Sequence, residues 1–126
     1  MPSKKSAPKF LNLILIKLPP SGLASIGHRV SGVVLFLSVP MISYLFGLSL
    51  ENERGFQTAQ ELLRSTPLLL LSVLLVWSLG HHLLAGIRHL LLDIDIGVDK
   101  LHARASAWLV NIGAVLVTGL YVVSIV

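Results

Sequence analysis

Three long stretches without Asp, Glu, Lys or Arg dominate this sequence, at residues 30–50, 65–87 and 105–126. Each holds about 20 mostly apolar residues, which as a helix rising about 1.5 Å per residue match a hydrocarbon layer of about 30 Å. The stretches must be helical, because lipid offers no hydrogen-bond partners to an open backbone. The sequence therefore predicts an all-α membrane protein with three transmembrane helices.

The composition agrees with lipid as the solvent of this chain. Hydrophobic residues make up 54% of the sequence and charged residues only 13%, whereas a soluble domain has about a quarter charged residues. The chain contains no cysteine, which excludes disulfides, thiolate metal sites, iron–sulfur ligation and covalent haem attachment within it.

The distribution of lysine and arginine predicts the orientation. The residues before the first stretch include no acidic side chain but five basic ones, Lys4, Lys5, Lys9, Lys17 and Arg29. Basic residues favour the cytoplasmic side, so we expect a cytoplasmic N-terminus and an external C-terminus. A nucleic-acid site would need aromatic stacking residues on a soluble platform, so we expect no nucleic-acid partner.

We interpret the whole chain, 1–126, as one membrane-anchor domain. It consists of a cytoplasmic arm and three spans, at 1–24, about 25–50, about 65–92 and about 105–126. The residues between the first two spans are predicted as a loop, and the apolar segment 10–16 is too short to span. The N-terminus resembles neither a secretory signal nor an arginine-rich transit peptide. We therefore expect a bacterial inner membrane, or a mitochondrial inner membrane if the chain is encoded in the organelle.

His82 is an ionisable residue that lies deep in the second span. It precedes Asp93 by 11 residues, about 16 Å along a helix, which places it near the bilayer centre. Ionisable groups at that depth are functional candidates, and neutral imidazole is a common axial ligand of haem iron. The alternative is a histidine that hydrogen-bonds across a helix interface.

The spacing around His82 favours the haem ligand. His82, Ala85, Gly86 and His89 recur at i, i+3, i+4 and i+7 and form one stripe, where the small residues let a flat macrocycle approach the backbone. His81 is rotated about 100° away. Histidines on one stripe cannot bind both faces of one haem, and the other two spans have no histidine in their membrane cores. A second ligand must then come from a partner chain, so haem implies a heteromer or homodimer.

A second polar cluster, Ser25, His28 and Arg29, stands at the cytoplasmic end of the first span. The cations His28, Arg29 and Arg88 can pair with haem propionates. A serine hydroxyl and a cation beside an apolar cavity also suit a quinone, whose carbonyls need donors during reduction. Snorkelling toward headgroups is the alternative for the arginines, weaker for Arg29 because it shares a helix face with Ser25.

Two segments resemble signatures of the larger membrane-anchor subunit of succinate dehydrogenase, its b-type cytochrome subunit. Residues 25–32, SIGHRVSG, resemble S-I-x-H-R-x-[ST]-G, and residues 82–93, HLLAGIRHLLLD, resemble H-x-x-x-G-I-R-H-x-x-x-D. The resemblance implies that His82 is the axial ligand of haem b and that Ser25 and Arg29 belong to the ubiquinone site. It places His28 near the propionates and the quinone, and it includes Arg88, His89 and Asp93 as neighbours of that site.

The resemblance also implies partners and a reaction. A smaller anchor subunit would supply the second haem ligand, and a flavoprotein and an iron–sulfur subunit would dock on the cytoplasmic face. Together they would pass electrons from succinate to ubiquinone, with this chain as a non-catalytic-domain subunit of a heteromeric helix bundle.

Two other functions stay open on sequence grounds. One is a fumarate reductase anchor that works in the reverse direction. The other is a small proton- or solute-conducting subunit that uses the histidines as a relay. The relay would need polar residues through the full membrane depth, and the third span offers few, such as Asn111, Thr118 and Ser124.

Overall fold

The computed structural model describes residues 18–125 and contains four helices. They are α1 (Pro20–Glu51), α2 (Glu53–Arg64), α3 (Thr66–Asp93) and α4 (Lys100–Ile125). Helices α1, α3 and α4 are long and apolar enough to cross a membrane, which confirms the predicted all-α class and three spans. The predicted lead-in and most of the predicted arm lie outside the described residues.

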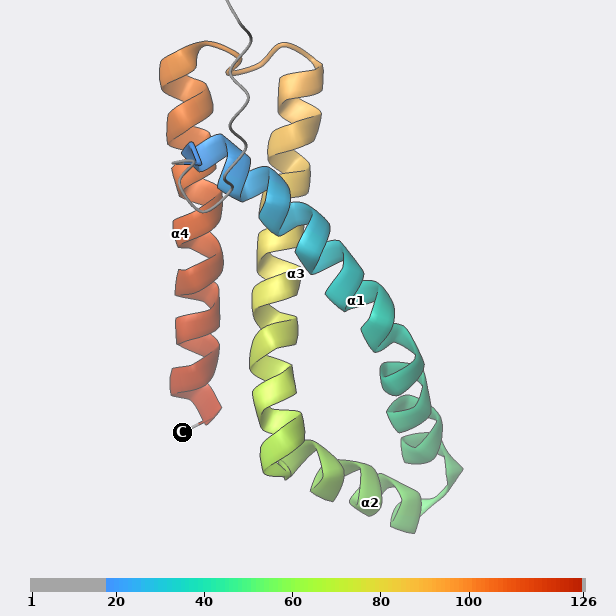
Figure 1. Cartoon of the computed structure of the whole chain (residues 1–126). Coiled ribbons are helices and arrows are strands. Elements are labelled where there is room, and N and C mark those ends of the chain that lie inside the picture. Colours follow the sequence, from blue (N-terminus) through green and yellow to red (C-terminus); the bar gives the residue numbers. More distant parts are fainter. Residues whose placement is uncertain (1–17, 126) are drawn as a thin grey trace, which may run out of the picture.

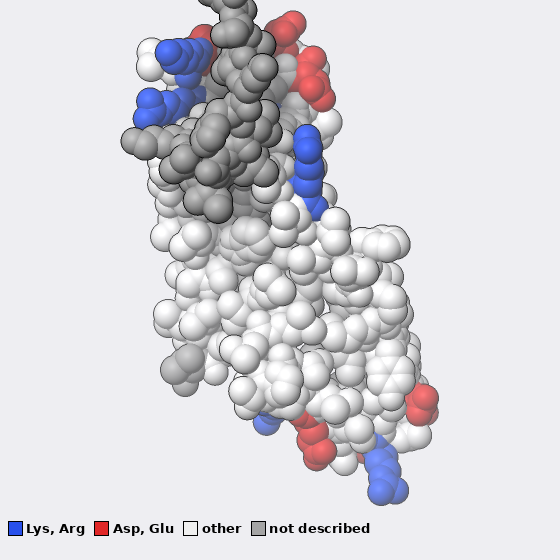
Figure 2. Space-filling model, in the orientation of Figure 1, with Lys and Arg blue, Asp and Glu red and all other residues white. Residues whose placement is uncertain are grey.

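Figure 1 shows how the helices are arranged. Helices α3 and α4 run side by side, and α1 crosses them obliquely before it diverges toward α2. The start of α1 and the α3–α4 connection lie at one end, whereas α2 and the end of α4 lie at the other. In Figure 2 the charged side chains gather toward these two ends, and an uncharged band separates them. This pattern is that of a chain whose middle lies in lipid.

The boundaries of the helices follow from local sequence. Helix α1 begins at Pro20, ahead of the expected residue 25, because proline has no N–H to leave unpaired in a first turn. At α4, both the backbone amide and the ring Nδ1 of His102 bond to the Asp99 carboxylate, at 3.2 and 2.6 Å. The backbone bond from His102, followed by the ring bond, lowers the pKa of Asp99 below its ordinary value.

The connection between the first two spans differs from its prediction as a loop, because it forms helix α2. The Asn52 side chain caps this helix by accepting a hydrogen bond from the Gly55 amide at 2.9 Å. Gly55 and Ala59 are buried, and a Cβ at Gly55 would overlap the Leu48 carbonyl oxygen of α1. A helix of 12 residues is marginal alone, so its packing against α1 stabilises it.

Small residues fill the interior and large ones face outward. Ala24, Ala85 and Ala107 are fully buried, whereas Phe36 is 75% exposed and Leu120 73%. Helices in lipid associate through close backbone packing, because lipid removes the drive to bury large apolar groups. The interior is therefore narrow, and any polar side chain within it lies close to two or three helices.

Candidate functional site

Three histidine rings meet between α1 and α3. The rings of His28 and His82 stack with centroids 4.2 Å apart and planes 10° apart. The ring of His89 meets the ring of His28 edge-on, at 5.2 Å. The α3 stripe that carries His82 and His89 therefore faces the N-terminal part of α1, where His28 completes a three-histidine cluster.

Hydrogen bonds to α1 fix the orientation of the His82 ring. Its Nδ1 lies 3.1 Å from the backbone oxygen of His28 and 3.4 Å from Ser31 Oγ. A carbonyl oxygen can only accept, so Nδ1 carries the hydrogen, and in a neutral imidazole Nε2 keeps its lone pair. Ser31 Oγ itself donates to the same His28 oxygen at 3.0 Å. The bonds leave Nε2 of His82 free of partners among the described residues.

Gly32 lets the His82 ring lie this close to α1. A Cβ on Gly32 would lie 3.0 Å from His82 Cε1, tighter than ordinary van der Waals contact. One turn along α3, a Cβ on Gly86 would lie 3.5 Å from His28 Nε2. Glycines on both helices thus provide the space that the stacked rings occupy.

His81 makes a separate connection among three helices. It is 2% exposed, and its Nε2 lies 3.2 Å from Asn111 Oδ1 on α4. Asn111 Nδ2 donates to the Pro20 oxygen of α1 at 3.4 Å, so Oδ1 is the acceptor for His81. On its other side the ring packs against Gly27. The contacts match those of a histidine that holds helices together in lipid.

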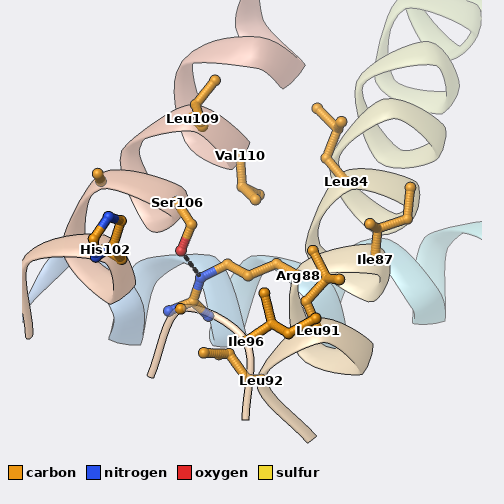
Figure 3. A pocket seen from close by; sticks show the side chains of 12 residues that line it. Leu84, Ile87, Arg88, Leu91, Leu92, Ile96, His102, Ser106, Leu109 and Val110 are labelled. Atoms are coloured by element: carbon orange, nitrogen blue, oxygen red, sulfur yellow. Dashed lines mark hydrogen bonds between the residues drawn. The ribbon is translucent and has the colours of Figure 1, made fainter. Parts of the chain in front are cut away.

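Arg88 faces away from the histidine cluster. Its side chain is buried, with 7% exposed. Nε donates to Ser106 Oγ at 3.0 Å, and Nη2 donates to the Ala103 oxygen at 3.1 Å and to Ser21 Oγ at 3.3 Å. Figure 3 shows Arg88 reaching from α3 toward Ser106 of α4. The guanidinium therefore bonds within the protein and does not snorkel.

Ser25 and Arg29 lie on the α1 stripe of His28 and Gly32. Ser25 is half-buried and Arg29 is exposed, and spacings of three and four residues put all four on one face. Neither Ser25 nor Arg29 hydrogen-bonds another described side chain. Asp93 is exposed at the last position of α3, without a described partner. The donors of Ser25 and Arg29 are thus free to meet a ligand beside the cluster.

The side chains of this site suit a metal ion whose other ligands come from a cofactor and not from this chain. Among residues 18–125, no group of three or more His, Cys, Asp or Glu side chains could hold a metal ion. A single imidazole with a free lone pair instead fits an axial position on iron already held by a macrocycle. The other ring nitrogen, Nδ1, bonds to a backbone oxygen. Such a hydrogen bond is the usual means by which a ligating histidine is oriented.

Sequence reasoning missed the residues that orient His82. Ser31 and Gly32 stand in the first signature, but their role depends on which face of α1 meets α3. Periodicity alone does not reveal that pairing. Asn111 gave a signal, as a polar side chain deep in the third span, but nothing in the sequence paired it with His81.

The family described as succinate dehydrogenase/fumarate reductase transmembrane subunit matches residues 3–122. The chain belongs to this family. The match confirms the predicted resemblance and a multi-pass membrane protein.

Relatives within the family are named succinate dehydrogenase cytochrome b556 subunit. The one from Coxiella burnetii is 34% identical, over 91% of this chain and 95% of its own length. The one from Rickettsia felis is 32% identical, over 85% of this chain and 83% of its own length. The one from Paracoccus denitrificans is 28% identical, over 82% of this chain and 80% of its own length. The similarity thus extends over nearly the whole chain and both signatures.

Proposed function

We propose that this chain is the haem-bearing membrane anchor of a succinate:quinone oxidoreductase in a bacterial inner membrane. His82 Nε2 binds the iron of haem b, and a smaller anchor subunit supplies the opposite ligand. Ser25 and Arg29 form part of the site where ubiquinone is reduced. A flavoprotein and an iron–sulfur subunit deliver the electrons of succinate from the cytoplasmic side.

The tautomer of His82 carries this proposal. A haem ligand needs one ring nitrogen that the protein orients and a second one whose lone pair is open. His82 donates through Nδ1 to α1 and keeps Nε2 available on a ring that is only partly buried. The neighbouring His81 uses its Nε2 on Asn111, and its Nδ1 is buried without a partner in the described part of the chain, where it is closed to a ligand. The two adjacent histidines therefore have different chemical roles.

The remaining histidines support a shared haem. The chain has five histidines, His28, His81, His82, His89 and His102. His28 stacks face to face on His82, and His89 lies on the same α3 stripe as His82. His81 bonds to Asn111 of α4, and His102 pairs with Asp99. None of the other four can reach the opposite face of a macrocycle bound to His82, so the second ligand belongs to a partner.

The polar residues beside the cluster would serve the quinone. A bound haem supplies a one-electron carrier close to that site. Ser25 can donate a hydrogen bond to a quinone carbonyl, and the Arg29 guanidinium can stabilise the charge that develops there during reduction. Both lie on the cytoplasmic part of α1, where protons from water are available.

The test is the optical spectrum of the purified complex with His82→Ala. We expect loss of the b-type Soret and α bands, while succinate still reduces an artificial dye. His102→Ala is the matched control, since its ring is exposed and bonds only to Asp99 among the described residues. A His82→Ala complex with the native spectrum would refute the ligand assignment.

A further inference from the structure

Arg88 is a buried cation without a counter-charge. Its three hydrogen bonds go to two serine hydroxyls and one backbone oxygen, all neutral groups. Among residues 18–125 the only ion pair joins Asp99 to His102. Arginine stays charged inside proteins, and a buried charge is normally paired. The structure thus leaves a positive charge that something outside these contacts must balance.

No acidic side chain of this chain can balance it. All six acidic residues lie in the described part, at Glu51, Glu53, Glu61, Asp93, Asp95 and Asp99, and none of them pairs with Arg88. The first 17 residues contain lysine but neither aspartate nor glutamate. These residues therefore cannot supply a negative charge. The anion must therefore come from another molecule.

An apolar cavity of about 420 Å³ lies beside the guanidinium, between α3 and α4. Its walls include Leu84, Ile87, Leu91, Ile96 and Leu109, with Arg88 as the cation (Figure 3). Ile87 is 48% exposed and Leu109 72%, so the cavity opens on the lipid-facing surface of the chain. Arg88 lies five residues before the end of α3, about 8 Å along the helix, near the headgroup level.

We propose that this cavity binds an anionic membrane phospholipid. The phosphate pairs with Arg88, and an acyl chain lies along the leucine and isoleucine walls. Cationic pockets between transmembrane helices on the cytoplasmic side are suited to such headgroups. Arg88 has a second terminal nitrogen, Nη1, that makes no hydrogen bond within the described residues and can donate to the phosphate.

The geometry favours a lipid over the other anions. A haem propionate would have to approach from the three-histidine cluster, but the Arg88 guanidinium bonds to Ser106 and Ala103 of α4 and to Ser21 in the first turn of α1. Free phosphate would not use the apolar walls. The three aspartates near this end are exposed to water, which screens their repulsion of the phosphate. The proposal concerns a face of α3 separate from His82 and does not depend on haem binding.

Lipid retention by the assembled complex tests this site. The detergent-purified complex is incubated with equal amounts of phosphatidylglycerol and phosphatidylcholine with identical acyl chains. Native mass spectrometry then counts the lipid that stays bound. We expect native protein to prefer phosphatidylglycerol by about tenfold, because the choline ammonium of phosphatidylcholine compensates its own phosphate, whereas phosphatidylglycerol brings a net negative charge to Arg88. Arg88→Gln should abolish this preference, and Arg104→Gln, an exposed α4 cation outside the cavity lining, should retain it.

A second variant covers the case in which Arg88→Gln does not assemble. Leu109→Trp keeps the cation but fills the cavity, and it should reduce retention of both lipids. Inorganic phosphate at about 10 mM should not displace the lipid, since it lacks an acyl chain. The absorbance of haem is recorded on the same samples, so failure of the haem assignment is seen separately.

Three results would overturn the proposal. One is native lipid preference in both Arg88→Gln and Leu109→Trp. Another is displacement of the lipid by phosphate alone, which would indicate a site for small anions. The third is an Arg88→Gln complex that keeps its lipid preference and loses its haem spectrum, which would make a propionate the counter-ion.

Discussion

Gly27 lies against the buried ring of His81, and Gly27→Ala tests how tightly α1 and α3 are packed there. A Cβ at this position would lie 2.5 Å from His81 Cε1 and 2.6 Å from its Nε2. Carbon atoms pack at about 3.5–4.0 Å, so the ring or the helix must retreat by about 1 Å. The ring has little room, because it is 2% exposed and bonds to Asn111.

The cost follows from these contacts. Overpacking a filled interior costs about 1–3 kcal/mol. Moving the ring away from Asn111 loses a hydrogen bond worth about 0.5–1.5 kcal/mol. We therefore expect Gly27→Ala to lower the free energy of unfolding by about 2–4 kcal/mol. The thermal midpoint should fall by roughly 5 °C or more.

The assay is the fraction of purified complex that survives a heating series, measured together with haem absorbance. Gly47→Ala is the matched control on the same helix, since a Cβ there would meet nothing within 4 Å. Adding His81→Ala to Gly27→Ala should recover part of the loss, because the methyl group then has space. Equal midpoints for Gly27→Ala and Gly47→Ala would refute the reasoning.

Three further predictions concern other parts of the chain. Arg29→Ala should lower quinone reduction by about tenfold while succinate still reduces a dye; equal loss of both would indicate failed assembly. Tyr121→Phe removes a 2.7 Å hydrogen bond to Ser72 and should cost about 0.5–1.5 kcal/mol in thermal stability, without changing the haem spectrum. The pKa of Asp99 is lowered by its bonds to His102, so the stabilisation is present at neutral pH and is lost as the pH falls through that lowered pKa. As the pH is lowered, hydrogen exchange of the His102 backbone amide, corrected for its intrinsic pH dependence, should then become faster in the native complex. The same increase in the Asp99→Asn complex would contradict this.

Much of the architecture could be predicted because lipid imposes simple rules. Three uncharged stretches specify three helices, since no other structure satisfies the backbone within each segment. The motif around His82 was visible for a related reason, because ionisable side chains are rare at that depth. The helix after Glu51 was not visible in this way. Its apolar positions are few, and its stability depends on the contact of Gly55 with α1.

The pairing of helix faces could not be predicted from one sequence. Spacing places Ser25, His28, Arg29 and Gly32 on one face of α1, but it does not say which helix that face meets. The glycines decide the contact, because a ring can approach the backbone only where no Cβ intervenes. Two apolar helices with many large residues offer several alternative pairings, and a periodicity argument does not rank them.

The second signature illustrates the limit most clearly. Arg88 and His89 are neighbours in the sequence, so the motif suggests one common site. On a helix they are about 100° apart, and Arg88 is about 120° from His82. His89 accordingly meets His28 of α1, whereas Arg88 bonds to Ser106 of α4. One short motif therefore serves two faces of α3. Its histidines and its arginine should be tested with different readouts, haem absorbance for the former and lipid retention for the latter.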